Sequence, residues 1–184
     1  ARVAQAEAHA ALRQRDEAAL ALQAADIAGQ LSGPLPATTG PRDIALRARW
    51  LAAGATVSGV DRVPLAPMAE VLDRALATDP AGQALGGSRR RLLAHMALQL
   101  GDAMVRQGQP EAARPRWQQA ARLLGATVEE PLTQALRAQL LLRQGQAQEA
   151  LTLADSLSSG PLRHPLYLDL LARLGRPLPA EGSR

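Results

Sequence analysis

A tetrapeptide that occurs twice constrains the fold more than any other feature of this chain. Arg–Gln–Gly–Gln stands at 106–109 and again at 143–146, so its glycines, Gly108 and Gly145, are 37 residues apart. Each copy separates two stretches whose apolar residues recur every three to four positions, the period of an α-helix. Repetition at roughly 20 to 50 residues is typical of stacked units that cannot bury their apolar faces alone. We therefore expect stacked helix pairs.

Helical patterns cover most of the remaining sequence, and no alternating run of β-branched residues predicts a strand. With 184 residues, the chain is long enough for one domain or a short solenoid with a sizeable core. Gly and Pro mark the boundaries between segments. The pattern predicts an N-terminal helix hairpin over 1–33, a Pro/Gly loop over 34–41, a degenerate helix pair over 42–80, a loop over 81–88, one repeat over 89–125, a second repeat over 129–160, a capping helix over 163–175 and a tail over 176–184.

Composition argues against several classes of protein. The absence of Cys excludes disulfides and thiolate metal sites but leaves the compartment open, cytosol or periplasm. No run approaches the roughly 18 apolar residues of a membrane-spanning helix. The formal net charge of +4 is small for a nucleic-acid binder. We expect no nucleic-acid partner and no membrane insertion in this segment. With neither a start Met nor a signal peptide at Ala1, we expect a fragment or a processed product.

Residues suited to catalysis or metal binding are sparse. His9, His95 and His164 have no second His or carboxylate at the spacing of a metal-binding helix. The stretch 85–92, LGGSRRRL, is compatible with an anion at a helix N-terminus or with a solvated loop in which Ser88 caps the helix. The two tryptophans, Trp50 and Trp117, stand among Leu and Ala as packing residues would. We expect no catalysis, cofactor or metal in this segment.

The best-defined unit has small and large residues at set places around its turn: Leu100, Gly101, Met104, Gly108, Ala113, Trp117 and Ala120. With these residues it resembles the tetratricopeptide repeat, a helix–turn–helix of about 34 residues. The second unit matches less fully, with Ala138, Leu141, Gly145, Ala150 and, where a bulky residue is usual, Ala154. The N-terminal unit matches with Ala6, His9, Ala18, Leu22 and Ala25, but has Arg13 in place of the turn glycine.

Two features depart from the family's pattern. The spacing exceeds the usual repeat by about three residues. In addition, Pro115 falls inside a second helix, where it removes a hydrogen bond and should kink or delay that helix.

The resemblance implies an all-α chain of antiparallel helix hairpins stacked in a right-handed superhelix. It implies protein–protein interaction, with a partner protein or peptide bound in a concave groove lined by the first helix of each pair. The groove positions carried over from the family are His95, Leu98, Asp102, Val105, Arg106, Leu132, Gln139, Leu142 and Arg143. The equivalent arginines Arg106 and Arg143 could grip a carboxylate or acidic peptide, or could bond to carbonyls at their helix ends. An alternative is a regulatory or substrate-recruiting tail of a bacterial Ser/Thr kinase or transcriptional regulator. Partner identity and oligomeric state stay open.

Overall fold

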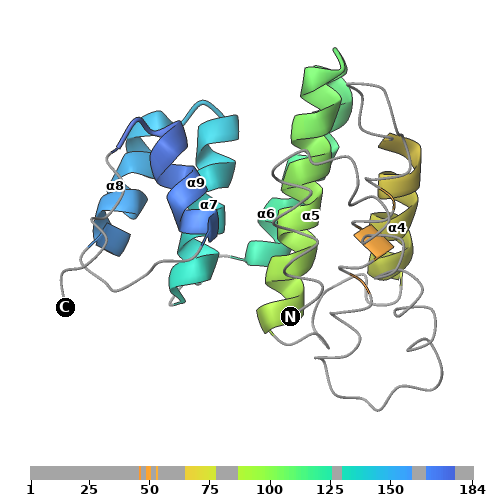
Figure 1. Ribbon diagram of the computed structural model, residues 1–184, viewed down its shortest axis with the longest axis horizontal. Helices are drawn as coiled ribbons and strands as arrows, with labels where there is room; N and C mark the ends of the chain where they lie inside the picture. Colours follow the sequence, from red (N-terminus) through yellow and green to blue (C-terminus); the bar gives the residue numbers. More distant parts are fainter. Residues whose placement is uncertain are drawn as a thin grey trace, which may run out of the picture.

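The computed structural model describes residues 46, 49, 50, 53, 65–77, 87–125, 130–158 and 165–176. Within these residues all regular structure is α-helical and no strand occurs, which confirms the all-α class for this part of the chain. The helices are α4 (Leu65–Ala77), α5 (Gly87–Arg106), α6 (Pro110–Leu124), α7 (Pro131–Arg143), α8 (Ala147–Ser158) and α9 (Pro165–Arg173), as Figure 1 shows. The predicted hairpin over 1–33 and the loop over 34–41 lie outside the described residues, as does the tail beyond Arg176.

Each helix packs against its neighbours in chain order. Helix α5 packs on α6, and α7 packs on α8, so each predicted pair is in contact. Helix α4 lies against α5, while α7 contacts both α5 and α6. Helix α9 then contacts both α7 and α8, as α7 contacts the pair before it. In Figure 1, α4, α5 and α6 stand on one side, and α7, α8 and α9 on the other.

The turns of the two pairs have the same backbone structure. Gly108 and Gly145 have φ of 76° and 79°, in the left-handed region that a residue without a Cβ adopts at little cost. The backbone N–H of Gln109 donates to the carbonyl of Met104 at 2.9 Å, and that of Gln146 to the carbonyl of Leu141 at 2.9 Å. This bond spans the glycine and satisfies a carbonyl in the last helical turn. The repeated tetrapeptide therefore encodes a repeated helix end.

The same turn occurs a third time, at the end of α9. Gly175 has φ of 65°, and the N–H of Arg176 donates to the carbonyl of Leu171 at 2.9 Å. Helix α9, predicted as a capping helix, thus ends in the same turn as α5 and α7, the first helices of the two pairs. Like α7, it contacts both helices of the pair before it.

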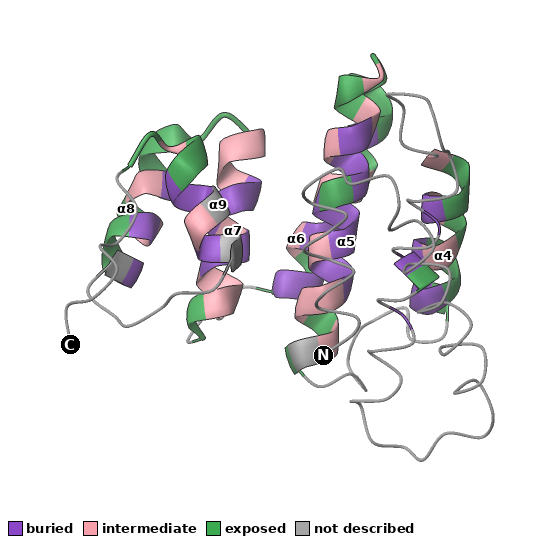
Figure 2. Cartoon of the chain, in the orientation of Figure 1, coloured by how far each residue is buried: buried purple, intermediate pink, exposed green. Residues whose placement is uncertain are grey.

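Two apolar clusters hold the helices together, and α7 contributes to both. The first cluster joins α4, α5 and α6 to Leu46, Trp50 and Ala53, and includes Leu136 and Leu140 from α7. The second contains the opposite face of α7, Ala135 and Ala138, with residues of α8 and α9. Figure 2 shows the buried residues facing the neighbouring helices. Because α7 is buried on two sides, it connects the two groups of helices.

Helices α5 and α6 approach closely at Gly101. A Cβ placed on Gly101 would lie 2.3 Å from the indole Nε1 of Trp117 and 2.7 Å from its Cδ1. The indole edge therefore lies directly against the α5 backbone, and its buried N–H has no hydrogen-bond partner among the described residues. Trp50 is also a packing residue: it is buried, and its Nε1 donates to Gln99 Oε1 at 2.9 Å.

Two local expectations were wrong. Helix α6 begins at Pro110 and continues through Pro115, so of the two expected effects of Pro115, a kink or a delay, the delay does not occur. Pro115 and Glu111, whose carbonyl loses its usual donor, are both exposed, and water can replace the missing bond. Helix α5 begins at Gly87, so Ser88 lies in its first turn and is not the N-cap residue.

Candidate functional site

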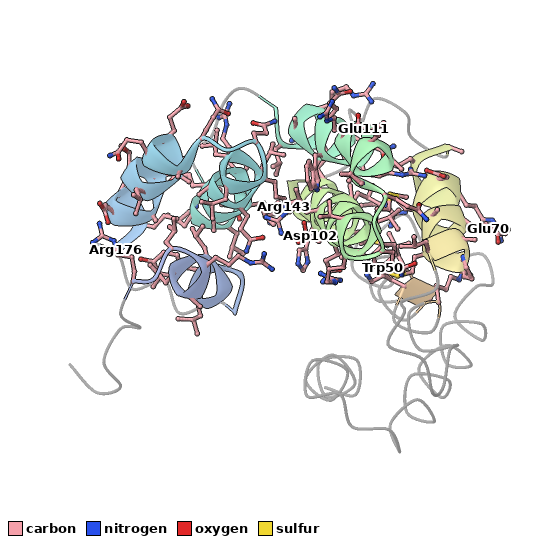
Figure 3. All side chains as sticks on the ribbon, turned by 90° about the horizontal axis from the view of Figure 1, so that it is seen from above. Trp50, Glu70, Asp102, Glu111, Arg143 and Arg176 are labelled. Carbon is pink, nitrogen blue, oxygen red and sulfur yellow. The ribbon has the colours of Figure 1, made fainter. Side chains whose placement is uncertain are left out.

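Asp102 of α5, near the middle of the helix stack, forms ion pairs with arginines of two other helices. Arg143 of α7 contacts both carboxylate oxygens: its Nε donates to Oδ1 at 2.6 Å, and its Nη2 donates to Oδ2. The side chains of Asp102 and Arg143 are only 14% and 9% exposed. Figure 3 shows the two side by side between α5 and α7. This bidentate pair fixes the first helix of one pair against the first helix of the next.

Arg143 is fully engaged within the protein. Besides Asp102, its Nη1 donates to the carbonyl of Gln139, one turn earlier in α7, at 2.6 Å. This is the carbonyl interaction expected as the alternative to ligand binding. Since the guanidinium is nearly buried and all its nitrogens have acceptors, Arg143 stabilises the stack and is not an exposed ligand-binding group.

A second guanidinium reaches the same carboxylate from α9. Nη2 of Arg173 lies 3.8 Å from Oδ2 of Asp102, and 45% of the Arg173 side chain is exposed. Arg173 was not among the predicted site residues. A signal was present, because Arg173 stands two residues before Gly175, as Arg106 stands before Gly108 and Arg143 before Gly145.

Two further residues of α5, Val105 and Arg106, lie close to Asp102. They follow Asp102 by three and four residues, which places all three on one face of α5. Arg106 is exposed and makes no ion pair with a described residue. Val105, 42% exposed, is the one large apolar side chain that is exposed among the described residues. We call Val105, Arg106 and Arg173 the Arg106–Arg173 surface.

The other positions carried over from the family do not all reach the surface. Leu98 is completely buried in the first apolar cluster, and Gln139 is 2% exposed, so both were wrongly assigned to an open groove. Leu98 belongs to the core of α4, α5 and α6, and Gln139 is buried between packed helices. His95, Leu132 and Leu142 are half-buried. The structure thus brings Asp102 and Arg143 together as a pair and leaves Val105 and Arg106 exposed beside them.

The basic stretch before α5 is part of the packing between helices. Arg91 forms an ion pair with Glu130, at the start of α7. Burial lowers the pKa of the Arg91 guanidinium below its usual value, and the neighbouring charge of Arg90 lowers it further. Arg91 therefore links the N-terminal part of α5 to the start of α7, which is a structural role for one of the three arginines of this stretch.

Among the described residues, no group of three or more acidic or His side chains is placed to hold a metal ion. No described helix is long and apolar enough to cross a membrane. Comparison of the chain with protein-family models, with curated proteins and with solved structures gives no match.

Proposed function

We propose that this chain is a non-catalytic protein-interaction module, built as a tetratricopeptide-like superhelix, that binds a partner protein or peptide on the face formed by α5, α7 and α9. The observation that carries the proposal is the recurrence of one helix end: Gly108, Gly145 and Gly175 close equivalent helices with equivalent hydrogen bonds. Helices of one kind, stacked side by side, present one continuous surface. Repeat proteins use such extended surfaces to bind other chains.

The packing supports the resemblance beyond the turns. The close contact of Gly101 with Trp117 joins the two helices of a pair, as the family's small and aromatic residues do. Helix α7 touches both helices of the pair before it, and α9 does the same. This succession of contacts is what stacked helical repeats require, since each repeat buries its apolar face against its neighbours.

The experiment compares three forms of the full chain as baits in a quantitative pull-down from lysate of the source cells. The first is the unchanged chain, and the second carries Val105→Gln and Arg106→Ala. The third carries Arg114→Ala and Gln118→Ala, which remove one exposed Arg and one exposed neighbour from α6. Circular dichroism verifies that all three remain helical.

The proposal expects proteins that the unchanged chain and the α6 variant retain equally, and that the Val105/Arg106 variant loses by at least tenfold. Retention that is equal for all three baits would place the partner elsewhere. A chain that retains nothing above an empty matrix would contradict the interaction function itself.

A further inference from the structure

Helix α9 lies in a seat of small side chains on the hairpin α7–α8. The residues that line this α9 seat are all buried: Ala135, Ala138, Ala150, Ala154 and Leu157. Helix α9 covers them with Tyr167, Leu170 and Leu171, which stand at i, i+3 and i+4 and so share one helix face. Without α9, the seat would be an apolar patch of a kind that proteins rarely leave exposed to water. The seat therefore requires an occupant.

Apolar contacts are the main hold on α9. With nine residues, Pro165–Arg173, it is the shortest of the described helices, and a helix of this length is not stable alone in water. Arg173 pairs with Asp102 and Arg176 pairs with Asp155, but the two arginine side chains are 45% and 46% exposed, so these pairs add little. Release of α9 would leave the first apolar cluster intact, because no residue of α9 belongs to it.

We propose that α9 is exchanged between two copies of this chain, so that each α9 seat holds the α9 of the other copy. This occupant fits, because it is the helix that the structure shows in the seat. The same apolar contacts and both ion pairs form again in the exchanged dimer, so exchange sacrifices no contact and costs the freedom lost on association. Residues 159–164 join α8 to α9, and six residues span about 20 Å when extended, which lets an attached α9 reach a second copy.

Exchange would change the make-up of the face formed by α5, α7 and α9. Within the Arg106–Arg173 surface, Arg173 would come from one copy, and Val105 and Arg106 from the other. The dimer would carry two such faces, and two linked faces raise the avidity for a partner that has two matching sites. The exchange itself does not depend on the proposed interaction function, since it concerns only α9 and its seat.

Two variants of the full chain with complementary defects test the exchange. Tyr167→Ala keeps the α9 seat but weakens its occupant, whereas Ala154→Glu keeps α9 but places a charge in the seat. When the two are mixed, the unchanged α9 of the Ala154→Glu chain can fill the unchanged seat of the Tyr167→Ala chain. With an affinity tag on the Tyr167→Ala chain, we expect it to retain at least tenfold more Ala154→Glu chain than untagged Tyr167→Ala chain. Equal retention of the two would overturn the proposal.

The matched control uses a tagged Leu72→Ala chain. Leu72 is completely buried in the first apolar cluster, so this variant is destabilised while its own α9 still fills the seat. It should retain at least fivefold less Ala154→Glu chain than the tagged Tyr167→Ala chain does. Equal retention would mean that any destabilised copy associates, and would overturn the exchange. Circular dichroism verifies that each variant is helical, and Ala154→Leu, which only overfills the seat, replaces Ala154→Glu if that variant is not.

Light scattering after size-exclusion chromatography tests the unchanged chain by itself. We expect a particle of twice the chain mass whose share rises with the concentration at which the chain was incubated. A chain that is monomeric at every concentration would contradict the exchange. So would a dimer that Tyr167→Ala forms as readily as the unchanged chain, because a contact outside the α9 seat would then join the copies.

Discussion

The hairpins α5–α6 and α7–α8 use the same turn but fill the space between their helices differently. Nine residues after its turn glycine, the first hairpin has Trp117, which packs on Gly101. The second has Ala154 at that place, and Ala138 in the place of Gly101. Two alanines fill less of the space between α7 and α8 than Gly101 and Trp117 fill between α5 and α6. The large side chain that completes this cluster comes from outside the hairpin.

That side chain is Tyr167 of α9. It is 1% exposed, belongs to the same apolar cluster as Ala138 and Ala154, and its hydroxyl lies 3.4 Å from the carbonyl oxygen of Ala154. In the first hairpin the large aromatic belongs to the second helix of the pair, whereas in the second it belongs to the next helix in the chain. We infer that the first hairpin completes its own crossing and that the second depends on α9.

The largest loss of stability should come from removing Tyr167, the aromatic side chain that α9 contributes to the second hairpin. Tyr167→Ala should lower the free energy of unfolding by about 4 kcal/mol, as expected for deleting a buried aromatic side chain. Tyr167→Phe should cost about 1 kcal/mol or less, because the hydroxyl bond is long. Urea unfolding followed by circular dichroism measures both. A loss below about 1 kcal/mol for Tyr167→Ala would show that α7 and α8 pack well without α9.

The second prediction compares the loss of stability on removing a nearly buried ion pair between helices with the loss on removing an exposed one. Asp102→Ala leaves the nearly buried Arg143 without its carboxylate and should cost about 2–3 kcal/mol, less than for a fully buried pair. Asp73→Ala is the control. Asp73 accepts two bonds from Arg116 but is 52% exposed, so its loss should cost below about 1 kcal/mol. Similar losses for both variants in urea unfolding would contradict a special role for Asp102.

The third prediction concerns the close contact in the first hairpin. Gly101→Ala should cost about 2 kcal/mol despite the better helix propensity of Ala, because the added Cβ overlaps Trp117. Trp117→Leu should remove most of that overlap. A double-mutant cycle over the two substitutions, measured by urea unfolding, should therefore give a coupling energy of about 1 kcal/mol or more. Additive losses would mean that Trp117 moves aside at little cost.

Within the described residues, the sequence pattern predicted the helix turns, since a turn depends on nearby residues. Helices α6 and α8 each begin two residues after the glycine of the repeated tetrapeptide, inside the predicted repeats 89–125 and 129–160. The role of Tyr167 was missed, because it depends on which helix meets Ala154 in space. The single Tyr of a chain with so few aromatic residues could have been recognised as a packing residue. The sequence does not indicate which helix it packs against.

The candidate site was less predictable for the same reason. Arg106 and Arg143 are each followed by Gln–Gly–Gln, yet one is exposed and the other nearly buried. The difference comes from Asp102 on α5, the helix against which α7 packs, because its carboxylate binds Arg143. The groove positions carried over from the tetratricopeptide family included Leu98, although it is a core residue. Burial of this kind is set by contacts between helices, which a repeat pattern does not specify.

The smallest predicted effect tests what the two hairpins share. Gly108→Ala and Gly145→Ala should each cost about 1 kcal/mol, because both place a Cβ on a residue in the left-handed region. Nothing lies within 4 Å of the added Cβ in either case, so backbone conformation alone sets the cost. Urea unfolding should give two losses within about 0.5 kcal/mol of each other, and Asn should be tolerated better than Ala at both places. Losses that differ by more than this would mean that the two turns, although equal in geometry, differ in the strain that the surrounding helices impose on them.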